Sequence, residues 1–144
     1  MTMVEVGGKP VVRREAEAEG RLALRPDTVE RIRDGKVAKG DPLATAKAAG
    51  VLAAKRVPDL LPFCHPLPLT GCDVDVRTDG DGVHVRTRVS TDGKTGVEME
   101  ALTAAAVALL TVWDMVKEYE KDAVGQYPAT SIEGVRVVRK EKGR

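Results

Sequence analysis

Apolar and polar residues alternate along several short parts of this chain, which is the pattern of a β-strand with one buried face. The first part is 14–24, where Glu and Arg alternate with Ala, Gly and Leu. Two more, 72–76 and 83–89, flank an Asp-Gly-Asp-Gly turn at 79–82, and this arrangement predicts a β-hairpin. Valines around 135–137 mark a last strand near the C-terminus.

Three other parts have the signals of helices. A Pro-Asp pair opens a short helix over 26–33, which Gly35 ends. Asp41, followed by proline, is the expected N-cap of a second helix over 42–55, whose Ala and Gly face predicts tight packing. Apolar residues at helical spacing predict a long helix over 97–121.

The remaining segments read as loops, and the order of elements predicts the fold. Four prolines stiffen the segment 57–71, and the segment 123–131 holds a glycine and a proline. The order is strand, two helices, hairpin, long helix, strand. It predicts an α+β, ferredoxin-like sandwich with an antiparallel sheet and helices on one face, and a single domain over residues 1–144.

The amino-acid composition excludes some classes of function and location. The chain is 42% hydrophobic but only 3% aromatic, so we expect small side chains to fill a small core and self-association to add to it. The net charge of +1 and the few aromatic rings disfavour nucleic-acid binding. With no apolar leader, no apolar run of about 20 residues and two cysteines, Cys64 and Cys72, we expect a cytoplasmic protein without a membrane segment.

The strongest local clue to chemistry is a thiol next to an imidazole in the proline-rich loop. Cys64 and His65 could move protons near neutral pH, since histidine titrates there. The alternative is structural: a small buried thiol and a histidine that caps a loop. A zinc site that also includes Cys72 and His84 is a weaker hypothesis, because the usual Cys-x-x-Cys spacing is absent.

A Gly-Lys-Thr-Gly turn at 93–96 resembles the end of a phosphate-binding P-loop. That motif needs a glycine where this chain has Arg88, which excludes a P-loop NTPase. The turn could still hold an anion at a helix N-terminus, or it could be an ordinary turn. Basic residues at element ends could likewise converge on phosphates or could simply be solvated; they are Lys9, Arg13, Arg14, Lys39, Lys55 and Arg56.

The long helix carries acids at both ends. Glu98 and Glu100 lie where the helix dipole favours carboxylates, whereas Asp114 lies late in the helix, where the dipole and desolvation would disfavour its charge unless Lys117 pairs with it. An exposed Asp114–Lys117 ion pair is the structural alternative. Glu100 and Asp114 are about 21 Å apart along the helix, so only two antiparallel helices across a dimer could bring both to one substrate.

Several strings are long and unusual enough to indicate a family. They are Met3-Val4-Glu5-Val6 with Lys9, Lys39-Gly40-Asp41-Pro42, Ala53-Ala54-Lys55-Arg56, Cys64-His65-Pro66-Leu67, Lys94-Thr95-Gly96-Val97-Glu98-Met99-Glu100-Ala101-Leu102-Thr103-Ala104 and Trp113-Asp114-Met115-Val116-Lys117. Together they resemble the MoaC family of cyclic pyranopterin monophosphate synthases over nearly the whole chain. The chain departs from the family at Glu5, Phe63, the segment 125–131 and the C-terminal tail.

The resemblance implies a lyase of molybdenum cofactor biosynthesis that converts 3′,8-cyclo-7,8-dihydro-GTP to cyclic pyranopterin monophosphate and releases pyrophosphate. It implies a homohexamer, a trimer of dimers with active sites between subunits, and neither cofactor nor metal. By motif, the catalytic residues are Asp114, Lys117 and Lys39, and the substrate-binding residues are Phe63, Cys64, His65, Met99, Glu100, Lys9 and Arg14. The alternatives are a non-catalytic module that binds a nucleotide or pterin, and a purely structural interaction protein.

Overall fold

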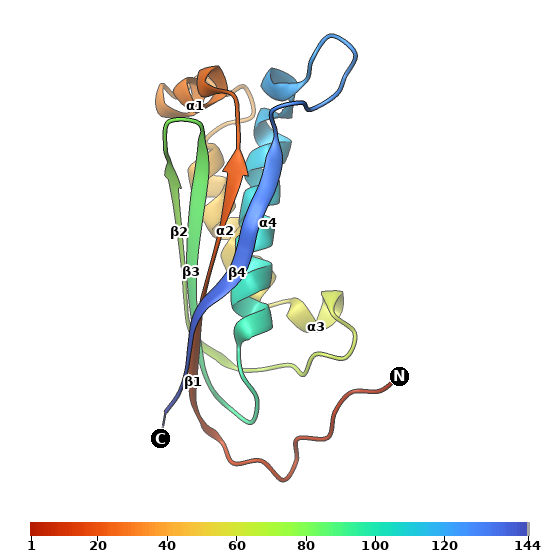
Figure 1. Cartoon of the computed structure of the whole chain (residues 1–144). Helices are drawn as coiled ribbons and strands as arrows, with labels where there is room; N and C mark the ends of the chain where they lie inside the picture. The colour runs from red at the N-terminus through yellow and green to blue at the C-terminus, as the bar shows by residue number, and fades with distance from the viewer. Residues whose placement is uncertain (144) are drawn as a thin grey trace.

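The computed structural model describes residues 1–143 and contains four strands and four helices (Figure 1). In chain order they are β1 (Val12–Ala23), α1 (Pro26–Arg33), α2 (Pro42–Ala54), α3 (Val57–Leu60), β2 (Leu69–Thr78), β3 (Gly82–Gly93), α4 (Glu98–Glu120) and β4 (Ser131–Lys142). The predicted strand, two helices, hairpin, long helix and strand are all present in this order, and the short helix α3 between α2 and β2 is an addition to it.

The strands form one antiparallel sheet in the order β2-β3-β1-β4. The central strand β1 pairs with β3 over its whole length and with β4 on its other side, where two register shifts interrupt the ladder. Gly134 of β4 has a φ of 64°, a conformation that suits glycine at such an irregularity. The sheet therefore has two open edges, β2 and β4.

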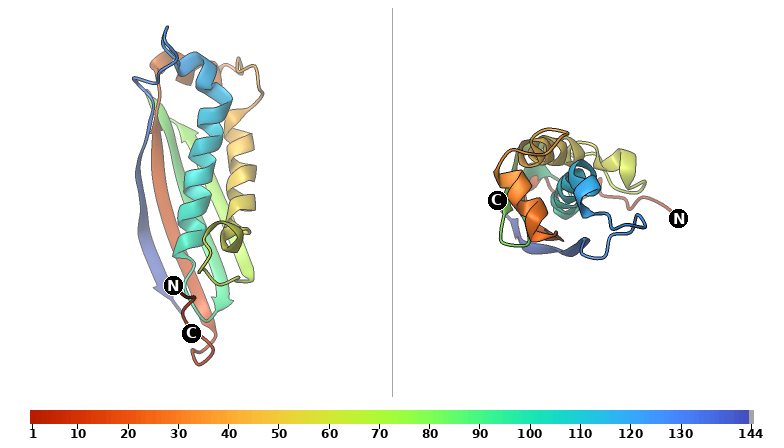
Figure 2. Two further views of the ribbon diagram at one scale, coloured as in Figure 1. Left: turned by 90° about the vertical axis from the view of Figure 1, so that its right-hand side faces the viewer. Right: turned by 90° about the horizontal axis from the view of Figure 1, so that it is seen from above.

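The two long helices α2 and α4 lie side by side on one face of the sheet (Figure 2). This confirms the predicted α+β, ferredoxin-like sandwich with helices on one face. Alanine side chains let the helices approach closely, and a Cβ added at Gly50 of α2 would lie only 3.1 Å from the carbonyl oxygen of Ala104 on α4. The small residues predicted to give tight packing therefore lie where the two helices meet.

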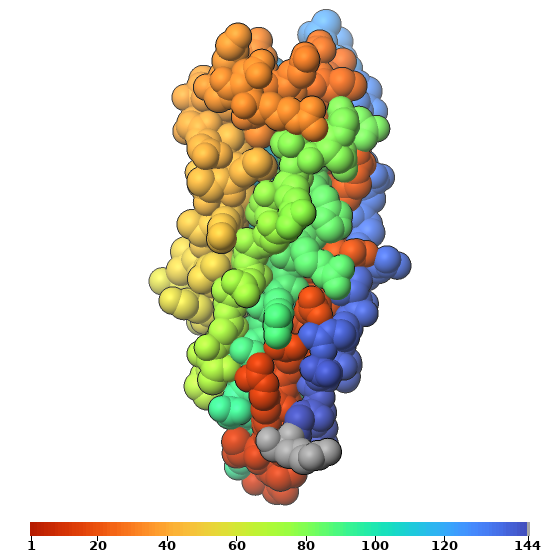
Figure 3. Space-filling model, turned by 90° about the vertical axis from the view of Figure 1, so that its left-hand side faces the viewer, coloured from red at the N-terminus to blue at the C-terminus, as the bar shows by residue number. Residues whose placement is uncertain are grey.

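The alternation of polar and apolar residues over 14–24 places the side chains of β1 on the two faces of the sheet in turn. Ala16, Ala18 and Leu22 are fully buried under the helices. Glu15, Glu17 and Glu19 point to the opposite face, where arginines of β3 and β4 pair with them. In the part of the chain that the structure describes, no helix covers the middle of this face, and the strands themselves form the surface in the space-filling view (Figure 3).

The segment 57–71 differs from its prediction as a loop. It begins with the single-turn helix α3 (Val57–Leu60), and β2 already starts at Leu69. Pro58 does not prevent the turn, because a proline in the first turn of a helix removes an N–H group that has no helical partner anyway. Val57 is fully buried and anchors this turn in the core.

The helix α4 is long and apolar enough to pass the length and hydropathy test for a membrane span. Half of its most apolar window is buried within this molecule, where it packs against α2 and the sheet. The core role of the helix accounts for its composition.

Candidate functional site

Lys39 lies in the loop between α1 and α2. Val37, just before it, is buried, and Gly40, just after it, has a φ of 123°, which only glycine adopts readily. Asp41 then accepts hydrogen bonds from the backbone N–H groups of Leu43 and Ala44, as the predicted N-cap of α2. The loop is therefore fixed on both sides of Lys39.

This loop brings Lys39 to two residues of α4. The Lys39 Nζ lies 3.6 Å from Asp114 Oδ1 and donates a hydrogen bond of 2.9 Å to the Asp114 main-chain carbonyl. On the same carboxylate, Lys117 Nζ lies 3.1 Å from Oδ1. The structure thus brings together the three residues that the resemblance assigns to catalysis, although 75 positions separate Lys39 from Asp114.

The charge of Asp114 is stabilised rather than disfavoured. Hydrogen bonding to Lys117, with the nearby charges of Lys39 and Lys117, lowers the pKa of Asp114 below its ordinary value. From the sequence, this charge was expected to be disfavoured unless Lys117 paired with it; the pair is present, and burial opposes the charge only weakly because 62% of the side chain is exposed.

A second group surrounds the N-terminal end of α4. Glu100 is only 2% exposed, and its Oε1 has no hydrogen-bond partner among the described residues. Its Oε2 lies 4.0 Å from the Sγ of Cys64. Burial raises the pKa of Glu100, and burial together with the Glu100 charge raises the pKa of the Cys64 thiol. Cys64 is therefore held as a thiol rather than as a thiolate.

The neighbours of Cys64 and Glu100 leave apolar surface open. Phe63 is 47% exposed and Met99 is 41% exposed. His65 is half-buried and lines an open, mostly apolar hollow of about 390 Å³ between the N-terminal segment and the 92–95 turn. A flat heterocycle could find apolar contacts in this hollow. Glu100 is not among the residues that line it.

The two predicted phosphate-binding residues have different surroundings. Arg14 is buried and donates hydrogen bonds to the carbonyl oxygens of Gly93 and Lys94, so in this chain its guanidinium supports the 93–96 turn. Lys9 is exposed in the N-terminal segment. Lys94 of the turn donates to the Gly7 carbonyl and ties that segment down.

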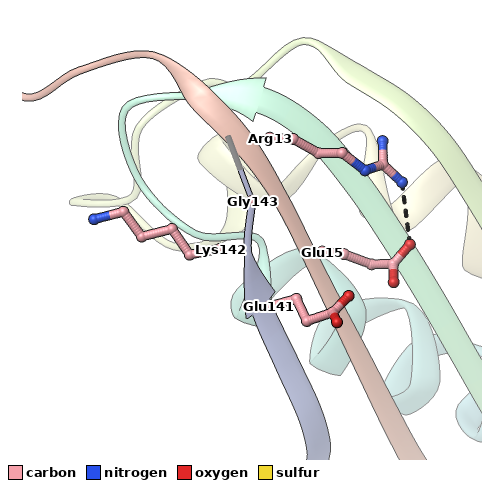
Figure 4. Close-up of a pocket in the computed structure, with 5 residues that line it drawn as sticks. All are labelled: Arg13, Glu15, Glu141, Lys142 and Gly143. Carbon is pink, nitrogen blue, oxygen red and sulfur yellow. Dashed lines mark hydrogen bonds and ion pairs between the residues drawn. The ribbon is translucent and has the colours of Figure 1, made fainter.

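Lys142, near the C-terminus, lies opposite Arg14 in the pairing of β1 with β4. A small hollow is lined by Arg13, Glu15, Glu141, Lys142 and Gly143, and Figure 4 shows Lys142 pointing away from Arg13 and Glu15. Arg13 instead pairs with Glu15 at 3.3 Å. Within residues 1–143, no three His, Cys, Asp or Glu side chains are grouped to hold a metal ion, so the four residues of the zinc hypothesis do not assemble.

Comparisons with known proteins show the family of this chain. Residues 3–143 match the MoaC family. The chain is 57% identical over 140 residues to the probable cyclic pyranopterin monophosphate synthase of Pyrococcus abyssi, which covers 97% of this chain and 88% of that protein. It is 57% identical over 143 residues to the protein of the same name from Methanoregula boonei, with coverages of 99% and 92%.

A third relative has a different printed name. It is the probable cyclic pyranopterin monophosphate synthase accessory protein of Methanothermobacter thermautotrophicus, 58% identical over 140 residues, with coverages of 97% and 88%. The present chain belongs to the MoaC family, and the resemblance read from its motifs is confirmed.

Two residues at the end of α4 escaped the sequence analysis. The Tyr119 hydroxyl accepts a hydrogen bond from the backbone N–H of Ala38, next to Lys39. Glu120 is fully buried and accepts hydrogen bonds from Thr28 and Thr130. Glu120 could have been suspected, since it follows Val112 and Val116 at intervals of four on the buried stripe. No spacing in the sequence indicates the contact of Tyr119.

Proposed function

We propose that this chain is a cyclic pyranopterin monophosphate synthase. It converts 3′,8-cyclo-7,8-dihydro-GTP to cyclic pyranopterin monophosphate and releases pyrophosphate, as a lyase in molybdenum cofactor biosynthesis. The observation that supports this most directly is the cluster of Lys39, Asp114 and Lys117, together with membership of a family whose relatives are named for this activity.

The cluster supplies the charges that the reaction needs. Asp114 is an anion held between two ammonium groups, so it accepts a proton from the substrate rather than donating one. Lys39 and Lys117 then act as proton donors and neutralise the charge that develops when pyrophosphate leaves. Phe63, Cys64, His65, Met99 and Glu100 bind the heterocycle, and Lys9 and Arg14 are assigned to the phosphates.

The single chain, one domain over residues 1–144, holds these groups too far apart for one substrate. The catalytic cluster and Glu100 lie about 21 Å apart along α4. We therefore assign the chain to a homohexamer, a trimer of dimers, in which an antiparallel α4 of a second copy completes each site. Exposed apolar residues on α4 and α2, namely Met99, Leu110 and Leu52, supply surface for such contacts. The cytoplasm, where GTP-derived substrates are made, is the expected location.

The experiment that tests the function is turnover of the cyclised GTP intermediate. Product is detected as pterin fluorescence after oxidation, and released pyrophosphate is measured alongside. Wild-type protein is expected to form both products in equal amounts. Binding of the intermediate without turnover would instead support a non-catalytic pterin-binding module.

Substitutions in the cluster sharpen this test. Asp114→Asn and Lys39→Ala are each expected to lower turnover by at least about 10²-fold, the lower range for loss of a positioned proton-transfer group. Lys36→Ala removes an exposed lysine from the same loop and serves as the matched control. A fully active Asp114→Asn protein with a slightly lower melting temperature would reduce Asp114 to a surface ion pair.

A further inference from the structure

Within residues 1–143, the main chain of the loop that carries Lys39 has one hydrogen bond to α4, and it lies one residue before the lysine. The backbone N–H of Ala38 donates a hydrogen bond of 2.9 Å to the hydroxyl of Tyr119. The side chain of Lys39 then reaches Asp114, five residues earlier on the same helix. Tyr119 and Asp114 thus hold the main chain and the side chain of the loop against one helix.

Tyr119 is itself held in place from two sides. Its ring packs against the hydrophobic core, and the guanidinium of Arg31 lies over its other side, 4.4 Å from the ring centroid. Arg31 belongs to α1, and its carbonyl accepts a hydrogen bond of 2.9 Å from the N–H of Lys36, in the loop. The aromatic ring therefore lies between α4, α1 and the start of the Lys39 loop.

The loop is fixed on both sides of Ala38 and Lys39, and these two residues themselves have few contacts. Val37 is buried and Asp41 caps α2, but Ala38 and Lys39 between them are exposed. Gly40, with its φ of 123°, is a point at which the chain turns easily. The Val37–Ala38 peptide that carries this N–H is held on its other side by a hydrogen bond of 3.1 Å from the Gly40 N–H to the Val37 carbonyl. Loss of the Tyr119 hydroxyl therefore leaves one hydrogen bond on this peptide instead of two, and the main chain next to Lys39 is held less firmly.

We propose that Tyr119 is a positioning residue for Lys39: its hydroxyl fixes the Ala38 peptide, so that the Lys39 ammonium stays at Asp114. The proposal rests on the proposed function, in which Lys39 acts in catalysis. Small displacements of a catalytic group reduce rate strongly, so a contact outside the substrate site can still control turnover. The test therefore needs one readout of the loop itself and one of the reaction.

The substitution is Tyr119→Phe, which keeps the ring over the core and under Arg31 and removes only the hydroxyl. The matched control is Tyr127→Phe, the same change at the other tyrosine, whose ring packs edge-on against Trp113 with centroids 5.3 Å apart. Both variants are made in the full-length chain. Equal melting temperatures show that packing is intact in both.

The first readout follows the loop without any reaction. Hydrogen exchange measured by mass spectrometry on peptides across Ala38 is expected to quicken in Tyr119→Phe only. Acylation of Lys39 by acetic anhydride, measured relative to Lys36 in the same loop, is expected to rise about three- to tenfold, since one hydrogen bond no longer holds the peptide. Unchanged exchange and acylation overturn the proposal, whether or not the protein turns over substrate.

The second readout is kinetic. In Tyr119→Phe, kcat is expected to fall about three- to tenfold, with KM changed by less than about twofold, because Lys39 acts in the chemical step. In a Lys39→Ala background, Tyr119→Phe is expected to cause no further loss. Equal losses in both backgrounds overturn the proposal, because Tyr119 would then act through another group. A wild-type protein that does not convert the substrate refutes the proposed function. The exchange and acylation results would still show whether the Tyr119 hydroxyl holds the Ala38 peptide.

Discussion

Glu100 is the residue whose surroundings differ most from those of an ordinary carboxylate. It is nearly fully buried, one of its oxygens lacks a partner within residues 1–143, and the other faces the Cys64 sulfur. Desolvation raises its pKa, the backbone N–H of Glu100 itself opposes this, and the nearby charge of Glu98 adds to the rise. A buried group with an unused oxygen is suited to accept a donor from a bound molecule.

This environment predicts how stability depends on pH. A carboxyl group whose pKa is raised by folding stabilises fully below its unfolded value of 4.5, and this contribution is lost as the pH rises through the folded pKa. Glu100→Gln should therefore gain melting temperature relative to wild type between pH 4 and pH 8. Glu118→Gln, an exposed position on the same helix, should keep a constant offset. Melting temperatures of wild type and Glu100→Gln that stay parallel over this pH range would contradict a raised pKa of Glu100.

Asp114 shows which contacts of a single residue can be predicted from the sequence. Its pairing with Lys117 followed from the three-residue spacing on a helix, and that pair is present. Its second partner, Lys39, came only from the family motif, because no periodicity relates residues 75 positions apart. Its exposure could not be predicted either, since the apolar pattern of the helix did not reveal which stripe the sheet would cover.

At the scale of elements, the last turn of α4 joins three parts of the fold. Glu120 is fully buried, and its carboxylate accepts hydrogen bonds from the backbone N–H of Arg25, which precedes α1, and from the hydroxyl of Thr28 within α1. It also accepts a hydrogen bond of 2.6 Å from the Thr130 hydroxyl, just before β4. One side chain thus connects α4 to the start of α1 and to the start of β4.

Removing this carboxylate should be costly. Glu120→Ala leaves three donors without their acceptor and opens space in the interior, so the free energy of unfolding is expected to fall by about 2–4 kcal/mol. Glu118→Ala, on the exposed side of the same turn, should change it by less than about 0.5 kcal/mol. Urea denaturation measures both. If the two variants are equally stable, Glu120 does not hold these elements together.

The elements themselves were largely predictable from the sequence, because each has a local signal. The alternation in β1, the Asp41 cap and the turn between β2 and β3 all lie where the pattern placed them. The short helix α3 was missed because its signal is tertiary. The burial of Val57 holds a single turn that four residues could not maintain alone.

At the scale of the whole molecule, the face of the sheet that the helices leave uncovered carries a network of ion pairs between neighbouring strands. Glu15 is 6% exposed and pairs with Arg88 of β3 at 2.9 Å and with Arg139 of β4 at 2.5 Å. The hydrogen bond from Arg139 is the largest cause of the lowered pKa of Glu15, with Arg88 also lowering it and burial opposing both. Rows of carboxylates on the central strand are thereby neutralised from both neighbouring strands.

A lowered pKa fixes the direction of the pH effect. The stabilisation from Glu15 is present above the unfolded value of 4.5 and is lost as the pH falls through the folded pKa. Glu15→Gln should therefore melt a few degrees below wild type at pH 7, and the difference should disappear by about pH 2. Calorimetry at the two pH values measures this. A difference that persists in acid would assign the effect of the substitution to packing instead of charge.

On the helical side of the sheet, large apolar side chains are exposed to solvent, and no contact within residues 1–143 of a single chain accounts for them. Leu110 is 54% exposed in the middle of α4, between Glu100 and Asp114 along the helix, and Leu52 of α2 is 52% exposed. Large exposed apolar side chains on two neighbouring helices indicate a contact surface. In the proposed assembly, this stretch of α4 lies against the antiparallel α4 of a second copy, which brings Glu100 of one subunit towards Asp114 of the other.

Leu110→Glu tests this arrangement, because it places a charge in the contact and leaves every proposed site residue unchanged. Light scattering is expected to show an assembly larger than a dimer for wild type and smaller species for Leu110→Glu, since burying an unpaired carboxylate is strongly unfavourable. Turnover should fall in parallel with dissociation, because each site needs groups from two subunits. Val124→Glu, at a 78% exposed position in the loop after α4, is the control and should change neither quantity. A monomeric Leu110→Glu protein with full activity would show that one chain forms the whole site, and the two ends of α4 would then have to act on separate substrates.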